Sequence, residues 1–477
     1  MSPGSRHARL RRKPQPVSVR DLALQVLVGV HSRGAFSDKL AESFAERHAL
    51  ERRDRALLNE LVKGTLRRRG TLDAVLAGYV HAGLDTLPAW IQNTLRLGAY
   101  QLLYLDRVPA HAAVSESVSL ARKYGHPGTA GLVNSVLRRL AEQPREAVLA
   151  ELAGPDPAGA GIAALSALTS HPQWLLERWL ASYPREEVLQ LTEANNRTAR
   201  VGLRANRLRL DARELIKRLA AAGVEAAPGR WSPSSVYIEG EVDLAELPGL
   251  ASGDCTVQDE SETLVGLLLA PRPGERVLDL CAAPGGKTGH LAELMGDRGE
   301  LVAVDKQPAR VRVLREGVER LHLRCVQVVE GDAEALVWER PFDRVLVDAP
   351  CSGLGVLARR ADARWRKKPE ILATMSLVQS GLLAAGARAV RPGGVLVYSV
   401  CTFEPEETAD RVRSFLAEHA DFRLADARPL LPAGVVSPEG FLLCLPHVHG
   451  TDGAFAARFE RSGGEAGGAA PTAGETA

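Results

Sequence analysis

The stretch from Val277 to Thr288 reads V-L-D-L-C-A-A-P-G-G-K-T and constrains the fold more than any other part of the chain. Its branched apolar residues are typical of a buried strand in a parallel sheet, and Pro284-Gly285-Gly286 is typical of a tight turn into a helix beginning near Thr288. In open α/β sheets, ligands lie beyond the carboxyl ends of the strands, where glycines let backbone N–H groups approach them. The stretch therefore predicts a nucleotide-binding turn.

The turn matches neither of two common nucleotide-binding patterns, and this disfavours some kinds of nucleotide. Gly286-Lys287-Thr288 nearly completes the phosphate-loop pattern G-x-x-x-x-G-K-[ST], but Cys281 occupies the position of its first glycine. The dinucleotide pattern G-x-G-x-x-G fails because Gly285 and Gly286 are adjacent. ATP and GTP are therefore disfavoured, and a glycine turn that merely links a strand to a helix remains the simplest alternative.

Length and composition indicate a soluble protein of several domains. The chain has 477 residues, of which 45% are hydrophobic and 25% charged. It contains no run of about eighteen or more apolar residues and no secretory signal, so we expect a cytoplasmic protein that does not bind membranes. The net charge is only +2, so a nucleic-acid partner would have to bind local basic patches.

The cysteines are expected to be free thiols. They number six, and their spacing includes no C-x-x-C pair, so neither a disulfide scaffold nor a zinc site is predicted: Cys255, Cys281, Cys325, Cys351, Cys401 and Cys444. We accordingly expect no bound metal.

The first third of the chain is predicted to be an all-α domain. A basic tail at 1–15, expected to be disordered, precedes a region at 16–145 in which apolar residues recur at helical spacing and Ser18 is placed to cap the first helix. The basic runs Arg67-Arg68-Arg69 and Arg138-Arg139 either contact RNA phosphates or form ordinary helix surface. A passage rich in Ala, Gly and Pro at 146–170 is interpreted as a linker.

Two further domains are expected after the linker. Residues 171–254 alternate strand, helix and strand and predict a small α+β platform. Residues 255–462 alternate strands and helices as in a doubly wound sheet, with strands at 276–280, 300–305, 324–329, 344–348 and 394–399. The remainder, 463–477, is expected to be disordered.

Acidic residues follow the second and third strands of this last domain. Asp305 ends the second strand, where such folds place the carboxylate that binds ribose hydroxyls, and Asp332 follows the third, where it suits an adenine amine. A single acid at a strand end is more often a turn residue, but together with the glycine turn these acids favour an adenosine site. Because no basic cradle for a triphosphate accompanies them, S-adenosylmethionine is the predicted cofactor.

Two cysteines also follow strands of this domain. Cys351 comes just after Asp348, and Cys401 follows the strand that ends near Ser399. A thiolate and an acid next to a methyl donor suit methylation at carbon 5 of a pyrimidine, because addition of the thiolate to carbon 6 makes carbon 5 nucleophilic. Asp348 is placed to hydrogen-bond ring N3. The spacing alone leaves open which cysteine attacks.

At these residues the chain resembles the RNA cytosine-C5 methyltransferases, and more narrowly the bacterial Sun/Fmu group acting on small-subunit ribosomal RNA. The resemblance lies in three motifs, 279–288, 348–355 and 399–402, and extends over most of the chain. It implies a NusB-like RNA-binding domain at 16–145, an RRM-like platform at 171–254 and a Rossmann-like methyltransferase domain at 255–462, in a monomer that binds unassembled ribosomal RNA.

The resemblance also implies the roles of individual residues. Cys401 would be the nucleophile, Cys351 would assist product release, and Asp348 would complete the catalytic set. The cofactor would be contacted by Cys281, Ala282, Ala283, Pro284, Gly285, Gly286, Lys287, Asp305, Asp332 and Asp348.

The segment after the Pro-Cys motif is expected to bind RNA. Its basic residues would hold phosphates while Trp365 stacks on a base: Arg359, Arg360, Arg364, Arg366, Lys367 and Lys368. Ala361 departs from the polar residue that the family pattern leads us to expect. A solvated basic loop is the simpler alternative.

Two other functions fit parts of the sequence. A non-catalytic RNA-binding or ribosome assembly factor could retain a vestigial nucleotide pocket, although binding alone requires neither Cys351 nor Cys401. An ATPase of the helicase or kinase type is disfavoured by Cys281, which replaces the first phosphate-loop glycine.

Overall fold

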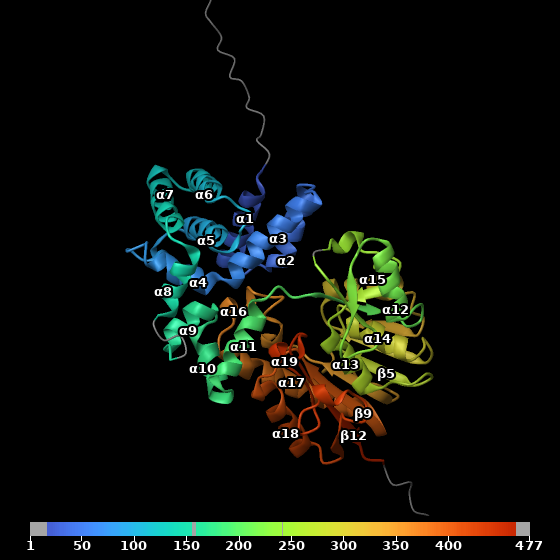
Figure 1. The fold of residues 1–477 in the computed structure, drawn as a ribbon. Coiled ribbons are helices and arrows are strands. Elements are labelled where there is room, and N and C mark those ends of the chain that lie inside the picture. Colours follow the sequence, from blue (N-terminus) through green and yellow to red (C-terminus); the bar gives the residue numbers. More distant parts are fainter. Residues whose placement is uncertain (1–16, 155–158, 241, 464–477) are drawn as a thin grey trace, which may run out of the picture. The chain divides into compact units, whose positions relative to one another are not determined.

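The computed structural model describes residues 17–154, 159–240 and 242–463 (Figure 1). The chain forms two compact units, residues 1–177 and 178–477. The tail expected at 1–15 and nearly all of the one expected at 463–477 lie outside the described residues.

The first unit is helical, as the sequence predicts. Its helices are α1 (Val19–Arg33), α2 (Ser37–Arg47), α3 (Arg52–Arg67), α4 (Arg69–Ala77), α5 (Ala89–Tyr104), α6 (Ala110–Tyr124), α7 (Pro127–Ala141), α8 (Arg145–Ala153) and α9 (Ile162–Thr169), with a short turn of 3-10 helix at Leu84–Thr86. Ser18 caps α1, since its hydroxyl accepts the Asp21 N–H at 3.2 Å. The core joins α4, α5, α6 and α7 through residues such as Leu95 and Leu137.

The segment 146–170 differs from the expected linker because most of it is helical. α9 packs on α4, where the Thr71 hydroxyl donates to the Ala167 carbonyl at 2.7 Å and the Gly70 N–H donates to the Ser170 hydroxyl at 3.0 Å. Its Ala-rich composition suits a small helix as well as a linker, and only the packing distinguishes the two.

The basic run at 67–69 is also less available than expected. Arg67 is buried, and Arg68 lies over the Tyr104 ring with its guanidinium carbon 5.1 Å from the ring centroid. Arg138 and Arg139 are exposed and remain candidates for contacting phosphates.

The second unit contains a small antiparallel sheet, ordered β2-β3-β1-β4, with helix α12 (Ala212–Ala221) packed on it. Its strands are β1 (Val201–Ala205), β2 (Ala226–Pro228), β3 (Ser235–Ile238) and β4 (Cys255–Val257). The expected boundary after residue 254 therefore falls one strand too early, because β4 pairs with β1 in this sheet.

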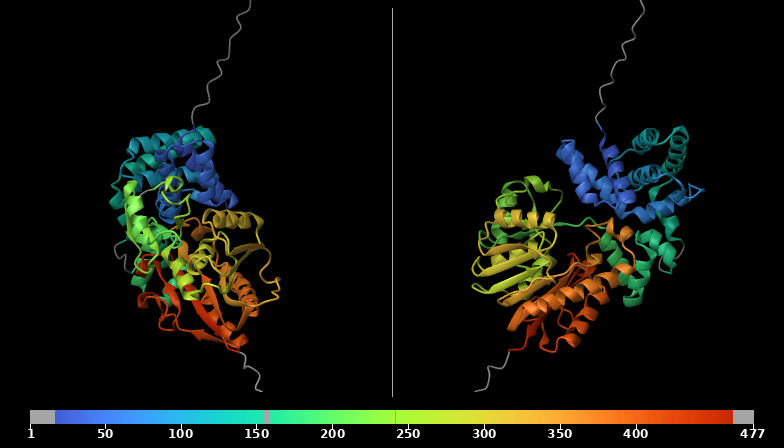
Figure 2. Two further views of the ribbon diagram at one scale, coloured as in Figure 1. Left: turned by 90° about the vertical axis from the view of Figure 1, so that its right-hand side faces the viewer. Right: turned by 180° about the vertical axis from the view of Figure 1, so that it is seen from behind.

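The large sheet has the order β10-β12-β9-β8-β5-β6-β7, with β11 paired to β12. β5, β9 and β12 are labelled in Figure 1, and Figure 2 shows the domain from two further directions. The run from β9 to β7 is parallel, and β10, β11 and β12 are antiparallel additions. The strands are β5 (Arg276–Leu280), β6 (Glu300–Asp305), β7 (Val326–Glu330), β8 (Phe342–Asp348), β9 (Val390–Val400), β10 (Phe422–Ala425), β11 (Leu442–Cys444) and β12 (Ala454–Arg461).

Helices cover both faces of this sheet. α13 (Glu260–Leu269) and α14 (Gly286–Leu294) share one core with strand residues such as Val277 and Leu346. α17 (Glu370–Ala389) and α18 (Ala409–Glu418) share another with the alternate residues, such as Leu278 and Val347. The remaining helices of this unit are α11 (Arg185–Asn196), α15 (Pro308–Arg320), α16 (Ala363–Arg366) and α19 (Pro446–His449), with short 3-10 turns at Leu244–Glu246, Leu354–Val356, Pro405–Glu407 and Ala433–Val435.

Part of the segment expected in the small platform contacts the large-sheet domain instead. Helix α10 (Gln173–Ser182) supplies Trp179, whose indole N–H donates to Glu404 Oε1 at 2.9 Å. Glu187 in α11 lies 3.2 Å from His447 Nε2. The residues before β1 thus contact the large-sheet domain, and the small antiparallel sheet itself begins at β1.

In the part of the chain that the structure describes, α17 is the one helix long and apolar enough to cross a membrane. Its Leu382 and Leu383 side chains are buried in the core of the large sheet. The helix is accordingly accounted for by packing within the domain.

Candidate active site

The glycine turn connects β5 to α14 as predicted. Cys281 has a positive φ of 62°, the conformation that glycine adopts most readily, at the position where a phosphate loop would have its first glycine. Gly285 precedes α14 at φ 105°, and a Cβ there would lie 2.7 Å from Leu314 Cδ1. Burial raises the pKa of the Cys281 thiol to about 12, so Cys281 stays protonated and is a poor nucleophile.

The small sheet supports this turn through Arg204. The Arg204 side chain extends from β1, donates to the Gly286 carbonyl at 2.7 Å and forms a 2.7 Å ion pair with Glu293 of α14. Both side chains of this pair are fully buried. The sequence gives no sign of this link, because Arg204 lies in another domain more than eighty residues before the turn.

The two acids expected to bind adenosine follow neighbouring strands, since Asp305 pairs in register with Glu330 at the end of β7. Asp305 is buried; its Oδ1 accepts the Gln307 N–H at 3.0 Å, and its Oδ2 lies 3.5 Å from Arg310 Nη2. Asp332 is exposed and accepts the Glu334 N–H at 3.1 Å. Their contact with a cofactor stays a prediction.

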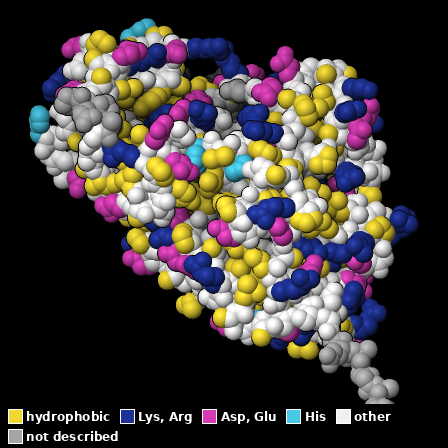
Figure 3. Space-filling view, turned by 60° about the horizontal axis from the view of Figure 1, so that its bottom comes forward, with side chains coloured by type: hydrophobic (Ala, Val, Ile, Leu, Met, Phe, Trp, Pro, Cys, Tyr) yellow, Lys and Arg dark blue, Asp and Glu magenta, His cyan; other side chains and the backbone are white. Residues whose placement is uncertain are grey.

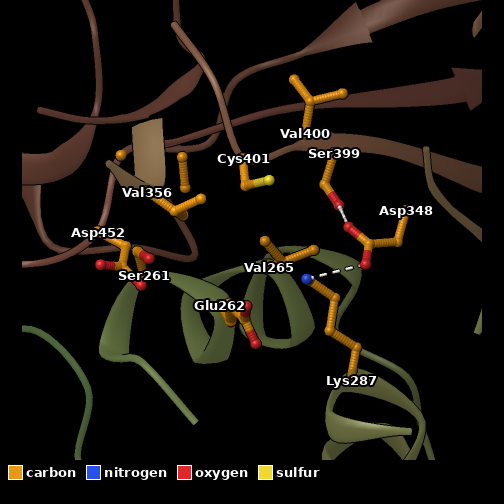
Figure 4. A pocket seen from close by; sticks show the side chains of 12 residues that line it. Ser261, Glu262, Val265, Lys287, Asp348, Val356, Ser399, Val400, Cys401 and Asp452 are labelled. Carbon is orange, nitrogen blue, oxygen red and sulfur yellow. Dashed lines mark hydrogen bonds and ion pairs between the residues drawn. The ribbon is translucent and has the colours of Figure 1, made fainter. Parts of the chain in front are cut away.

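A small pocket opens at the carboxyl ends of β8 and β9 (Figure 4). It is lined by Ser261, Glu262, Val265, Lys287, Asp348, Val356, Ser399, Val400, Cys401, Asp452, Gly453 and Ala454. β5 and β8 are adjacent although β6 and β7 intervene in sequence, so the pocket lies at the point where the strand order reverses. That is the usual ligand site of doubly wound sheets.

Two predicted site residues, Lys287 and Asp348, meet in this pocket. Lys287 Nζ donates to Asp348 Oδ2 at 2.9 Å, and the Ser399 hydroxyl donates to Asp348 Oδ1 at 2.6 Å (Figure 4). Burial alone would lower the pKa of Lys287, but the carboxylates of Asp348 and Glu262 hold that pKa above its ordinary value. Lys287 is therefore an ammonium ion that fixes and partly neutralises Asp348.

The two predicted catalytic thiols face each other. Cys351 Sγ lies 3.1 Å from Cys401 Sγ, and Cys401 lines the pocket. The hydrogen bond with Cys401, together with burial, raises the pKa of Cys351 well above that of a free thiol. Cys351 thus keeps its proton, which leaves Cys401 as the sulfur better suited to attack.

In the basic segment after Cys351, two of the arginines that the sequence assigned to RNA phosphates bind protein groups instead. Arg364 is fully buried, where it donates to Asn196 Oδ1 at 2.7 Å, and it cannot contact phosphate. Arg359 is ion-paired with both Asp259 and Asp452. A guanidinium binds carboxylates as readily as phosphates. The run of basic residues in the sequence therefore could not show which of these two partners an arginine binds.

The remaining members of that segment are more accessible. Arg360 and Lys368 are exposed, and Ala361 is buried, which explains why no polar residue is needed there. On the face shown in Figure 3, Lys and Arg side chains are interspersed with acidic and apolar ones and do not form one continuous basic area.

Several pocket residues were missed from the sequence. Glu262 and Asp452 line the pocket, and Asp452 is held by Arg359. Their only sequence signal is an acid near a strand or helix end, which is too common to be selective. Within the described ranges, no group of three or more His, Cys, Asp or Glu side chains could hold a metal ion.

Asp279 predicts a specific pH dependence of stability. Burial raises its pKa from 3.8 to about 7, so the folded protein binds this proton more tightly than the unfolded chain does. The contribution of this proton to the free energy of unfolding is fully present below about pH 4 and is lost as the pH rises toward 7. Relative to Asp279→Asn, the free energy of unfolding of the wild type should fall by up to about 1.4 kcal/mol per pH unit between these limits.

Urea unfolding of both proteins at several pH values measures this difference. Asp452, whose pKa burial also raises to about 7, is present in both proteins and cancels in the comparison. Parallel pH profiles for wild type and Asp279→Asn would contradict the assignment.

Gly453 predicts a steric effect on the pocket wall. Its N–H donates to the Gly355 carbonyl at 2.8 Å, and a Cβ at Gly453 would lie 2.7 Å from Gly355 Cα. Backbone cannot yield as a side chain can, so Gly453→Ala should displace the wall beside Cys401 and lower the rate of the reaction in this pocket about 10- to 100-fold. Single-turnover rates of the Gly453→Ala variant measure this loss. Gly131→Ala is the control, because a Cβ at Gly131 would meet no other atom within contact distance.

The strand order, the glycine turn and the Lys–Asp–thiol cluster together define an α/β enzyme of the methyltransferase class. Comparison with known proteins gives the family. The family described as "16S rRNA methyltransferase RsmB/F" matches residues 266–460, the NusB family matches 17–142, and an RsmF/B-like ferredoxin-like domain matches 171–245.

The relatives cover nearly the whole chain. It is 36% identical over 452 residues to the "probable ribosomal RNA small subunit methyltransferase B" of Bacillus subtilis, with 94% of this chain and 99% of the relative covered. It is 36% identical to ribosomal RNA small subunit methyltransferase B of Pseudomonas syringae pv. tomato, over 86% of this chain and 90% of the relative. The chain therefore belongs to the RsmB/F methyltransferase family.

Solved structures agree with this fold. PH0851 covers 94% of this chain, and is itself covered over 99%, with a TM-score of 0.78 and 27% identity. NSun6 from Pyrococcus horikoshii, solved with SFG, covers 62% of this chain and is covered over 99%, with a TM-score of 0.57 and 22% identity. The expected order of a NusB-like helical domain, a small α+β domain and a methyltransferase domain is confirmed.

Proposed function

We propose that this protein transfers a methyl group from S-adenosylmethionine to carbon 5 of a cytosine in small-subunit ribosomal RNA, through a covalent bond between Cys401 and carbon 6. The observation that carries the proposal is the pair of thiols, Cys351 and Cys401, 3.1 Å apart beside the ion pair of Lys287 and Asp348. A protein that only bound RNA would need neither thiol.

The pocket residues suit the addition step. The Cys401 thiolate forms a bond to carbon 6, and the electron pair of the 5,6 double bond moves into the ring, which makes carbon 5 nucleophilic. The proton released from the Cys401 thiol is taken up at ring N3, where Asp348, held by the Lys287 ammonium, would accept a hydrogen bond from the resulting N–H. S-adenosylmethionine, when bound, supplies the methyl group to carbon 5.

Release reverses the addition. A base removes the hydrogen on carbon 5, its electron pair restores the double bond, and the bond from carbon 6 to sulfur breaks so that its pair returns to Cys401. Cys351 is the group at hand to assist, because its Sγ lies 3.1 Å from that of Cys401. Its raised pKa keeps Cys351 in the thiol form, so its S–H can donate a hydrogen bond to the departing Cys401 sulfur.

The glycine turn fits an adenosyl cofactor. Asp279 Oδ1 beneath the turn is buried and, among the described residues, has no hydrogen-bond partner, while Thr288 donates to the other oxygen at 2.6 Å. Residues 281–287 would line the cofactor, Asp305 would accept its ribose hydroxyls, and Asp332 would accept its adenine amine. This arrangement differs from a phosphate loop, in which backbone N–H groups and a lysine surround phosphates.

Small-subunit ribosomal RNA is the substrate we propose because the B. subtilis and P. syringae relatives carry that function in their names. The helical domain, which matches the NusB family, would hold the RNA. The target cytosine must leave its stack to reach a pocket at the strand ends, so we expect an unpaired or flipped base.

Incubation with S-adenosylmethionine labelled in its methyl group and with undermodified small-subunit ribosomal RNA tests the proposal. Nucleoside analysis of the RNA should recover the label in 5-methylcytosine. Demonstrated binding of the cofactor with no label in cytosine would refute catalysis and favour an RNA-binding assembly factor.

A further inference from the structure

Behind the Cys351 loop lies a buried carboxyl group that the proposed reaction does not yet use. Glu407, in the 3-10 turn Pro405–Glu407, is fully buried. Its Oε2 accepts the backbone N–H of Ser352 at 2.8 Å and the side-chain amide of Gln379 at 2.8 Å. Burial also raises the pKa of Glu407. Because burying a carboxyl group costs free energy, we expect Glu407 to have a function in its surroundings.

Gln379 completes a clamp around Cys351. Its side chain extends from α17, is fully buried, and also donates to the Pro350 carbonyl at 3.0 Å. The peptide groups on both sides of Cys351 are therefore held by one bonded pair of side chains, Pro350 by Gln379 and Ser352 by Glu407.

Glu407 and the loop of Cys351 are each anchored to β9 or to the residues that follow it. The Tyr398 hydroxyl of β9 donates to the Glu407 carbonyl at 2.7 Å, which fixes the 3-10 turn to the strand that precedes Cys401. The Ser352 hydroxyl donates to Thr402 Oγ1 at 3.1 Å, which ties the loop of Cys351 to the residue after Cys401. The position of one thiol relative to the other is thus set through these contacts.

We propose that Glu407 and Gln379 are positioning residues that hold Cys351 against Cys401, and that product release depends on them while addition to the base does not. This inference rests on the proposed function. Cys401 comes directly after β9 and lies beside Ser399 and Asp348, so its approach to carbon 6 does not require the clamp. Loss of the clamp should therefore slow product release and leave the addition of Cys401 to the base unchanged.

The full-length variants Glu407→Ala, Glu407→Gln and Gln379→Ala test this separation. Each is incubated with S-adenosylmethionine and undermodified small-subunit ribosomal RNA, and two quantities are measured: the covalent protein–RNA complex on a denaturing gel and multiple-turnover methylation. We expect Glu407→Ala and Gln379→Ala to slow turnover about 10- to 100-fold while the covalent complex accumulates.

Glu407→Gln is the conservative rescue. Its amide oxygen can replace Oε2 as acceptor of both N–H groups, so its turnover should stay within a few-fold of wild type. Glu404→Gln is the matched control, because Glu404 is a buried glutamate of the same segment that instead binds Arg178 and Trp179. The amount of covalent protein–RNA complex relative to the turnover rate should be the same in Glu404→Gln as in the wild type.

The outcomes distinguish the clamp from the proposed function. A wild-type protein that methylates no cytosine overturns both. A wild type that turns over, with clamp variants that either release product normally or lose complex formation and turnover equally, overturns the clamp alone. If Glu407→Ala fails to fold, Gln379→Ala decides between these results, since it keeps the carboxyl group.

Discussion

Replacing Cys401 by alanine is expected to abolish both methyl transfer to cytosine and formation of a covalent protein–RNA complex, with a loss of roughly a thousandfold or more in rate. Cys401 lines the pocket beside Asp348, and no other sulfur can take its place: Cys351 keeps its proton, and Cys281 has a pKa raised by burial. Single-turnover transfer of labelled methyl groups measures the first effect, and a denaturing gel the second.

Cys351→Ala is the matched variant, since it removes the facing thiol and leaves the pocket lining intact. It should still add to the base and accept the methyl group, but the complex should accumulate because release lacks its assisting thiol. If Cys351→Ala lost the complex and Cys401→Ala accumulated it, the roles of the two cysteines would be exchanged.

The second large effect is expected at Arg204. Replacing it by alanine leaves Glu293 as an uncompensated buried carboxylate, which should lower the free energy of unfolding by about 3–5 kcal/mol. It also removes the donor to the Gly286 carbonyl, so cofactor affinity should fall in the fraction that stays folded. Urea unfolding and equilibrium dialysis with S-adenosylmethionine measure the two effects.

Arg209→Ala provides the control for Arg204. Arg209 belongs to the same small domain and pairs with Asp254 at 3.0 Å, but more than a third of its side chain is exposed, so its loss should cost less than about 1 kcal/mol. Equal destabilisation by the two substitutions would mean that the buried pair with Glu293 does not join the two domains as described.

The parallel part of the fold could be predicted because each strand is a short, branched apolar run that ends in an acid, a glycine or a cysteine. The strands at 276–280 and 300–305 match β5 and β6 in the structure. The antiparallel strands β10, β11 and β12 were not predicted, since β12 pairs with β9, more than fifty residues before it in sequence, and β10 and β11 pair with β12.

The site could be predicted where chemistry and strand ends coincide. Lys287, Asp348 and Cys401 each follow or end an element whose carboxyl end meets the same edge of the sheet, and the structure brings them together. Arg204 and Gln379 could not be predicted, because each reaches the site from another element through a buried side chain. Arg359 and Arg364 were assigned to RNA because the sequence shows charge and not burial.

Trapping with an RNA that carries 5-fluorocytosine at the target position tests most directly whether Cys401 attacks carbon 6 during methylation at carbon 5. Fluorine on carbon 5 cannot leave as a proton does, so the adduct should persist, and mass spectrometry of the digested complex should find the methylated nucleotide on the peptide that contains Cys401. An adduct on Cys351, or methyl transfer with no adduct on either cysteine, would contradict the proposed mechanism.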